Sequence, residues 1–265
     1  MTARSARRGP PVPSYVFLLF PALLFMLLMY AYPFGASIVR SFLGPKGGFS
    51  LENYVKTFDL YAKDILFTFS VTIFNTALTG ILAVLIAVYF RIRQNRITRM
   101  LAAMYKLPIF IPFVVVAQMM NSFLAPHGLL NVALAQTGLI DIERPLQLFN
   151  FAGLSFGFVW KQIPFAVLII HGGFQMIDNS YIEAARSTGA NLLKVILRVL
   201  IPMNKSGILV ALVLVYSQIV GTFTLPYMLI GGKIPTTITV DIAHRVNYFR
   251  DFGVANALGV FSYIL

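Results

Sequence analysis

The chain has 265 residues, of which 58% are hydrophobic and only 11% are charged, whereas soluble domains average about half apolar and about a quarter charged residues. A water-soluble fold could not bury that much apolar surface, so the composition predicts one all-helical membrane domain over residues 1–265. The absence of cysteine excludes disulfides, Cys-ligated zinc and thiol nucleophiles. The formal charge of +12 is spread along the chain and predicts no nucleic-acid partner.

About 20 apolar residues are needed for a helix to cross the hydrocarbon layer of a bilayer. A sixth apolar segment begins near Gly253 and reaches the last residue too soon to cross, so we expect six transmembrane helices with the last one truncated. Prolines inside several segments predict kinks. The five complete segments are residues 15–34, 66–90, 101–125, 154–176 and 207–230.

Lysine and arginine accumulate on the cytoplasmic side of membrane proteins, and their distribution orients the chain. With the N-terminus inside, 12 of the 21 basic residues fall on the cytoplasmic side and the remaining nine are assigned outside. The loop of residues 91–99 carries four arginines and no acidic residue. We therefore expect a multi-pass protein of the inner membrane, embedded in the lipid bilayer, with a cytoplasmic N-terminus.

A polar stretch, residues 178–206, separates the fourth and fifth segments on the predicted cytoplasmic side and has the pattern of two short helices. Ser180 and Glu183 have the spacing of a capping box, which predicts the start of the first helix. Gly189 suits the left-handed residue that often ends a helix. Pro202 predicts the end of a second, amphipathic helix.

The same stretch resembles the EAA loop of ABC-importer permeases, written EAA-x3-G-x9-I-x-L-P. The glutamate, both alanines, the glycine and the proline match, while valine and isoleucine replace the two aliphatic positions. These residues are Glu183, Ala184, Ala185, Gly189, Val199, Ile201 and Pro202. The resemblance implies a type I permease with six helices, in which this loop docks on a cytoplasmic ATPase. Shorter similarities at residues 50–54, 128–131 and 251–257 follow the order of the same family.

The resemblance also implies partners: a dimer of ATP-binding subunits, a second and unlike permease that completes the pore, and an extracytoplasmic solute-binding protein. The chain has no G-x-x-x-x-G-K-[ST] loop, so ATP must bind to another polypeptide. The three histidines lie on different segments without metal-ligand spacing, so no catalytic residue, metal or cofactor is expected. The resemblance suggests a sugar or a polyamine as the solute, since residues 187–190 favour a polyamine permease and residues 107–112 favour a sugar permease.

Polar side chains inside the apolar segments are candidates for the solute path, because a lipid-facing position would leave their hydrogen bonds unmet. Each of them could instead bond to a neighbouring helix. The candidates are Gln118, Asn121, Gln162, His171, Gln175, Gln218 and Thr222. No acidic residue lies at the middle of a segment, which argues against an ion-coupled secondary carrier. Such a carrier, or a membrane scaffold without a pore, is the alternative interpretation.

Overall fold

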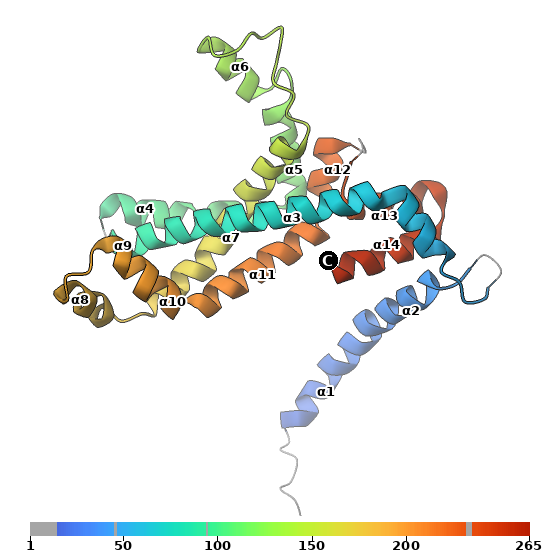
Figure 1. Cartoon of the computed structure of the whole chain (residues 1–265), viewed down its shortest axis with the longest axis horizontal. Helices are drawn as coiled ribbons and strands as arrows, with labels where there is room; N and C mark the ends of the chain where they lie inside the picture. Colours follow the sequence, from blue (N-terminus) through green and yellow to red (C-terminus); the bar gives the residue numbers. More distant parts are fainter. Residues whose placement is uncertain (1–14, 45–46, 94, 232–234) are drawn as a thin grey trace, which may run out of the picture.

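The computed structural model describes residues 15–44, 47–93, 95–231 and 235–265, and the fold of these residues is helical (Figure 1). Its helices are α1 (Tyr15–Met26), α2 (Tyr32–Ser41), α3 (Glu52–Ile92), α4 (Arg96–Met104), α5 (Phe113–Leu124), α6 (Leu129–Gln136), α7 (Phe151–Gln175), α8 (Asn179–Ser187), α9 (Leu192–Val195), α10 (Ile201–Met203), α11 (Lys205–Gly221), α12 (Thr224–Ile230), α13 (Ile238–His244) and α14 (Phe252–Ile264). Shorter turns join some of them: the π-helical turns Leu27–Ala31, Ile196–Leu200 and Arg245–Phe249 and the 3₁₀ turn Leu107–Phe110.

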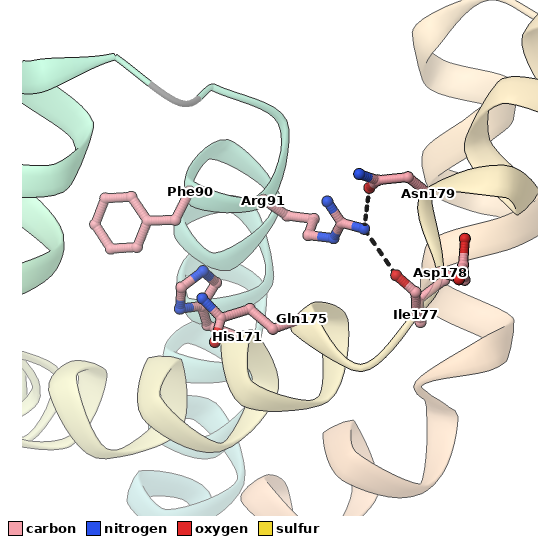
Figure 2. Close-up of a pocket in the computed structure, with 7 residues that line it drawn as sticks. All are labelled: Phe90, Arg91, His171, Gln175, Ile177, Asp178 and Asn179. Atoms are coloured by element: carbon pink, nitrogen blue, oxygen red, sulfur yellow. Dashed lines mark hydrogen bonds between the residues drawn. The ribbon is translucent and has the colours of Figure 1, made fainter.

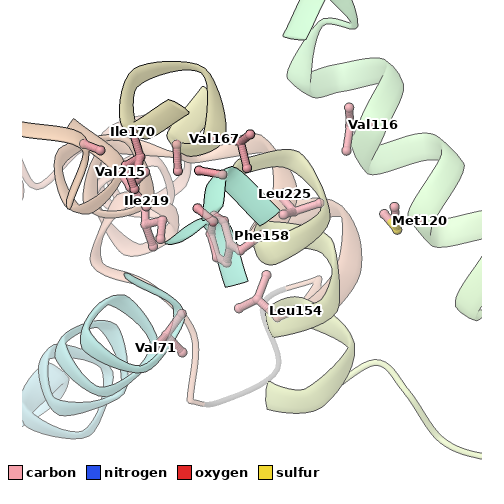
Figure 3. Packing of buried hydrophobic residues seen from close by; sticks show 14 of the residues in the cluster. Val71, Val116, Met120, Leu154, Phe158, Val167, Ile170, Val215, Ile219 and Leu225 are labelled. Carbon is pink, nitrogen blue, oxygen red and sulfur yellow. The ribbon is translucent and has the colours of Figure 1, made fainter. Parts of the chain in front are cut away.

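Three long helices, α3, α7 and α11, pack against one another at the centre of the bundle (Figure 1). The buried face of α3 consists largely of small and short polar side chains, which let helix backbones approach closely in a membrane. A Cβ on Gly80 would lie 2.4 Å from the Leu212 side chain of α11, and Asn75 donates to the Ser155 hydroxyl of α7 at 3.1 Å. The apolar core between the three helices includes Val71, Leu154, Phe158, Ile170, Val215 and Ile219 (Figure 3).

The two ends of α3 define two ends of the bundle (Figure 1). The end at Ile92 carries α4, α8, α9 and α10, and the end at Glu52 carries α2, α13 and α14. Helices α5 and α6 lead away from the bundle, and so does α1. The side chains of α1 are exposed from Leu19 onward, so lipid or another chain must cover them.

The predicted count of six spans is not confirmed in the described part of the chain. Four stretches there are long and apolar enough to cross a membrane, namely Leu19–Ser41, Glu52–Ile92, Phe113–Gln136 and Phe151–Gln175. The pair Leu192–Met203 and Lys205–Gly221 is apolar enough only when taken together, and its two helices meet at a bend of 71°. Helix α14 covers 13 described residues, fewer than the about 20 that a span needs.

The predicted span over residues 101–125 is interrupted where its prolines predict a kink, and the interruption is a full break of the helix. Helix α4 ends at Met104, and α5 begins only at Phe113. Two prolines explain the break: Pro108 has no N–H for the Met104 carbonyl, and Pro112 has none for the Pro108 carbonyl. Apolar composition alone predicts the same span with or without such a break.

The predicted span over residues 207–230 is also interrupted, at Thr222. Helix α11 ends one residue before Thr222, and α12 begins two residues after it. Pro226 cannot donate to the Thr222 carbonyl, which accepts a hydrogen bond from the Thr239 hydroxyl at 3.0 Å instead. The break therefore ties the end of α11 to the segment that forms α13.

Asn204 forms the corner between the short helices α8–α10 and α11. Its side-chain amide is almost fully buried and donates to the Ile170 carbonyl of α7 at 2.8 Å. Glycines on the two neighbouring helices leave the necessary space, since a Cβ on Gly173 would lie 2.0 Å from the Asn204 side chain and a Cβ on Gly207 2.3 Å. The corner is therefore fixed against α7.

Two adjacent glycines of α7 test this corner. We expect Gly173→Ala to displace Asn204 and to destabilise the protein by about 1–3 kcal/mol, the usual cost of overpacking. Nothing lies within 4 Å of a Cβ at Gly172, so Gly172→Ala should leave stability unchanged or slightly improve it. Thermal unfolding of both variants in detergent measures the difference. Equal unfolding temperatures for the two variants would contradict the proposed corner.

Candidate functional site

Helix α8 begins at a different cap from the one that the sequence predicts. The Asp178 carboxylate accepts a hydrogen bond from the Ser180 N–H at 2.8 Å. The predicted capping box of Ser180 and Glu183 is therefore wrong, because Asp178 already satisfies a free donor of the first turn. Hydrogen bonds from the Ser180 backbone and hydroxyl, helped by the charge of Arg91, hold the pKa of Asp178 below its ordinary value.

The end of α8 confirms the prediction for Gly189. This residue has φ of +81°, its N–H donates to the Arg186 carbonyl at 2.9 Å, and the next N–H, of Ala190, donates to the Ala185 carbonyl at 3.1 Å. The turn therefore closes onto the last carbonyls of the helix. Nothing lies within 4 Å of a Cβ at this position, so the backbone conformation, and not a lack of space, requires glycine.

The second predicted helix of this stretch is present but not uniform. The Asn191 side chain caps its start, and the helix widens into the π-helical turn Ile196–Leu200 just before Pro202. Pro202 has no N–H for the Arg198 carbonyl, which favours the wider turn. The helix continues one residue beyond Pro202, so the predicted stop is one residue early. Val199 and Ile201, the two aliphatic positions of the motif, are half-buried.

Helices α8–α10 expose both charged and apolar side chains. Glu183 and Ala184 are exposed and Ala185 is half-buried, while Tyr181 and Leu192 add exposed apolar surface on the same unit. Contiguous exposed apolar side chains mark surfaces that another molecule covers. This unit is therefore a candidate docking surface.

A second candidate site lies at the middle of α7, beside the break between α4 and α5. A cavity of about 250 Å³ is lined there by the broken segment, by α7 and by Gln218 of α11. Gln162 is 1% exposed, and its Nε2 has no hydrogen-bond partner among the described residues. A buried donor left unmet costs about 1–3 kcal/mol. Gln162 therefore borders the cavity with an amide nitrogen that no described residue satisfies.

Lys161, which the orientation count assigned to the outside, lies in α7 and also lines this cavity. Its ammonium group is buried and donates to the carbonyls of Pro108 at 2.8 Å, Ile109 at 3.3 Å and Ile111 at 2.7 Å. These carbonyls belong to the broken segment, where proline removes a backbone donor. A lone lysine within an apolar span is the signal in the sequence that points to such a role.

Four of the seven predicted path residues line two separate cavities. Gln162 and Gln218 share the central cavity. His171 and Gln175 line a separate cavity of about 430 Å³ at the end of the bundle, where α7 leads into α8 (Figure 2). The structure thus brings only one pair of the candidates together at mid-bundle.

The other three predicted path residues lie elsewhere. Asn121 donates to the Met228 carbonyl at 2.9 Å, and the Thr222 hydroxyl donates to the Gln218 carbonyl in the last turn of α11. Both therefore have a structural hydrogen bond. Gln118 is exposed and borders a mostly apolar cavity of α5 and α7.

Residues 78–261, well over half of the chain, match the model of the family of binding-protein-dependent transport system inner membrane components. The chain belongs to this family. The resemblance to ABC-importer permeases and the multi-pass, inner-membrane character of the permease are therefore confirmed.

Curated relatives of the permease differ in the solutes that their names state. The chain is 28% identical over 272 residues to the sulfoquinovosyl glycerol transport system permease protein SmoG of Agrobacterium fabrum, and the match covers 94% of this chain and 85% of the relative. It is 26% identical over 187 residues to the spermidine/putrescine transport system permease protein PotB of Escherichia coli, covering 70% of this chain and 67% of the relative.

A solved structure confirms the fold of the permease. A chain of a bacterial alginate ABC transporter, crystallised in complex with an alginate pentasaccharide-bound periplasmic protein, superposes with a TM-score of 0.78. The match covers 95% of the permease and 89% of that chain at 19% sequence identity. The all-helical, polytopic fold is therefore the one predicted from the sequence.

Proposed function

We propose that this permease forms half of the solute pathway of an ATP-driven importer and that α8–α10 dock on a separate ATPase. The observation that carries the proposal is the rigid construction of this exposed unit. It is capped at Asp178, turned at Gly189 and anchored to α7 through Asn204. A rigid unit can pass movement of a docked subunit to the helices it joins. The exposed Glu183 supplies a charge that a basic residue of the ATPase can meet.

Helices α8–α10 and the N-terminus are cytoplasmic in this proposal. The arginine-rich segment 91–99 lies at the same end of the bundle as α8, because the Arg91 guanidinium donates to the Asn179 side chain at 2.6 Å. Loops rich in arginine are retained in the cytoplasm. The cytoplasmic side inferred for the arginine-rich segment therefore applies to α8 as well.

Two more partners complete the proposed importer. The central cavity is lined from α7, α11 and the broken segment, and a second, unlike permease is proposed to face it. A solute-binding protein is proposed to deliver solute at the opposite, extracytoplasmic end of the bundle. The alginate transporter with the same fold was crystallised with a periplasmic protein, which supports this partner.

We propose that the solute passes through the central cavity and is a sugar. The side chains of Gln162 and Gln218 offer amide hydrogen bonds, and Phe110 and Phe165 offer aromatic surface. Hydrophobic and aromatic walls with a few polar groups are the usual composition of small-molecule sites. Lys161 adds a positive charge to the same lining, and its repulsion of a cation disfavours a polyamine.

A single introduced cysteine tests the side of the membrane, because residues 1–265 contain no other cysteine. We expect a membrane-impermeant maleimide to label Ser187→Cys in inside-out vesicles and not in intact spheroplasts. Glu143→Cys, in the exposed segment between α6 and α7, is the matched control and should label from the opposite side. Labelling of Ser187→Cys from outside would overturn the cytoplasmic assignment.

Docking is tested at Gly189. An alanine at a left-handed position costs about 1–2 kcal/mol, so Gly189→Ala should reduce co-purification of the ATPase roughly tenfold. Gly138 has φ of +75° and, like Gly189, no atom within 4 Å of a Cβ. Gly138→Ala therefore imposes a similar strain outside the docking unit and should leave co-purification unchanged. Equal ATPase recovery with both variants would refute the docking role of α8–α10.

The central cavity is tested at Gln162. We expect Gln162→Leu to lower uptake of the sugar carried by the cognate binding protein by roughly tenfold, because a hydrogen bond to the solute is lost. Thermal stability and ATPase co-purification should not fall, since the amide nitrogen has no partner to lose among the described residues. Gln118→Leu, at an exposed position, is the control. Uptake at the wild-type rate by Gln162→Leu would exclude this cavity from the path.

A further inference from the structure

Arg91, in the last turn of α3, connects three elements at the end of the bundle that carries α8 (Figure 2). Its Nε donates to the Phe174 carbonyl at 2.8 Å. Its Nη2 donates to the Ile177 carbonyl at 2.8 Å and to the Asn179 side-chain oxygen at 2.6 Å. One planar guanidinium therefore joins the end of α3 to the end of α7 and to the start of α8.

The positions of the three acceptors explain what this group holds in place. Phe174 lies in the last turn of α7, Ile177 lies in the three-residue connection to α8, and Asn179 is the first residue of α8. The last carbonyls of a helix lack intrahelical donors and favour a nearby cation. Arg91 satisfies the carbonyls of Phe174 and Ile177, and its bond to Asn179 also fixes the start of α8. A three-residue connection without such contacts would let α8 swivel relative to α7.

The opposite end of α8–α10 is held in a similar way. Asn204, at the junction with α11, donates to the Ile170 carbonyl one turn before Phe174. Both ends of the unit are therefore clamped to the same last two turns of α7, one by Arg91 and the other by Asn204. Arg91 differs in also bringing α3, the longest helix of the bundle, into the clamp.

We propose that Arg91 is a positioning residue that makes α8, α7 and α3 move as one body when the docked ATPase moves. This inference rests on the proposed docking of α8–α10. Its specific content is that removal of the guanidinium leaves the ATPase docked and active but weakens the transfer of its movement to the helices. Lysine is a poor substitute, because its donors all come from one nitrogen atom, whereas Arg91 donates from two separate nitrogens of a planar group.

The test uses the complete importer, with both permeases, the ATPase and the binding protein, reconstituted in liposomes. Uptake of the cognate sugar per ATP hydrolysed is compared for the wild type, Arg91→Ala and Arg91→Lys. We expect ATPase co-purification and ATP hydrolysis to stay within about twofold of the wild type, while uptake per ATP falls roughly tenfold in Arg91→Ala and less in Arg91→Lys. Arg93→Ala, at an exposed arginine two residues further on, should behave as the wild type.

Asn179→Ala removes one of the three acceptors and guards against misfolding of the arginine variant. It should lower uptake per ATP by roughly threefold. A wild-type ratio in both Arg91→Ala and Asn179→Ala overturns the inference, and so does a parallel loss of hydrolysis and uptake, which indicates a purely structural role. If the wild-type permease itself recovers no ATPase, the proposed docking fails instead, so the two failures are distinguishable.

Discussion

The structure depends on one constraint: a backbone carbonyl or amide that a helix break frees inside a membrane has no water to bond with and needs a partner from the protein. Side chains from distant elements supply these partners. Lys161 donates to the carbonyls of the break before α5, and Thr239 donates to the carbonyl at the break after α11. Each break is thereby tied to another part of the fold.

The same constraint accounts for the central cavity. A continuous helix over residues 101–125 would direct its backbone groups along its own axis and present only side chains to α7. Because α4 stops at Met104, the carbonyls of the residues that follow it turn toward Lys161, and a cavity lies there against Gln162 and Gln218. The cavity is therefore a consequence of the prolines in this segment, and its charge comes from the lysine that satisfies the broken backbone.

Structural features that depend on local backbone preference could be predicted from the sequence. Features that depend on contacts with residues far away in the chain could not. The all-helical class and the left-handed turn at Gly189 depend on composition and on one residue type. The cap of α8 was misplaced by two residues, because Asp178 and Ser180 are both good capping residues and the path of the chain out of α7 decides between them.

The side chains that bond to the backbone at the helix breaks could not be predicted from the sequence. Prolines mark where a span is interrupted, but nothing local identifies the donor that compensates. Lys161 bonds to residues about 50 positions away in the chain, and Arg91 bonds to Phe174, 83 positions away. Without the fold, a lysine within an apolar segment is only a candidate, and an arginine at the end of a span looks like any other cytoplasmic charge.

Helix α7 connects the two candidate sites, and its own sequence indicates how they would communicate. Its last two turns are clamped by Arg91 and Asn204, and Gln162 lies twelve residues before Phe174, about 18 Å along the axis at 1.5 Å per residue. Pro164 lies between them and removes one of the hydrogen bonds that would stiffen the helix. In the proposed mechanism, a movement of α8 therefore turns the clamped end of α7 as a unit, and the helix yields first at Pro164. That residue follows Gln162 by two positions, so a bend at Pro164 would fall beside the central cavity.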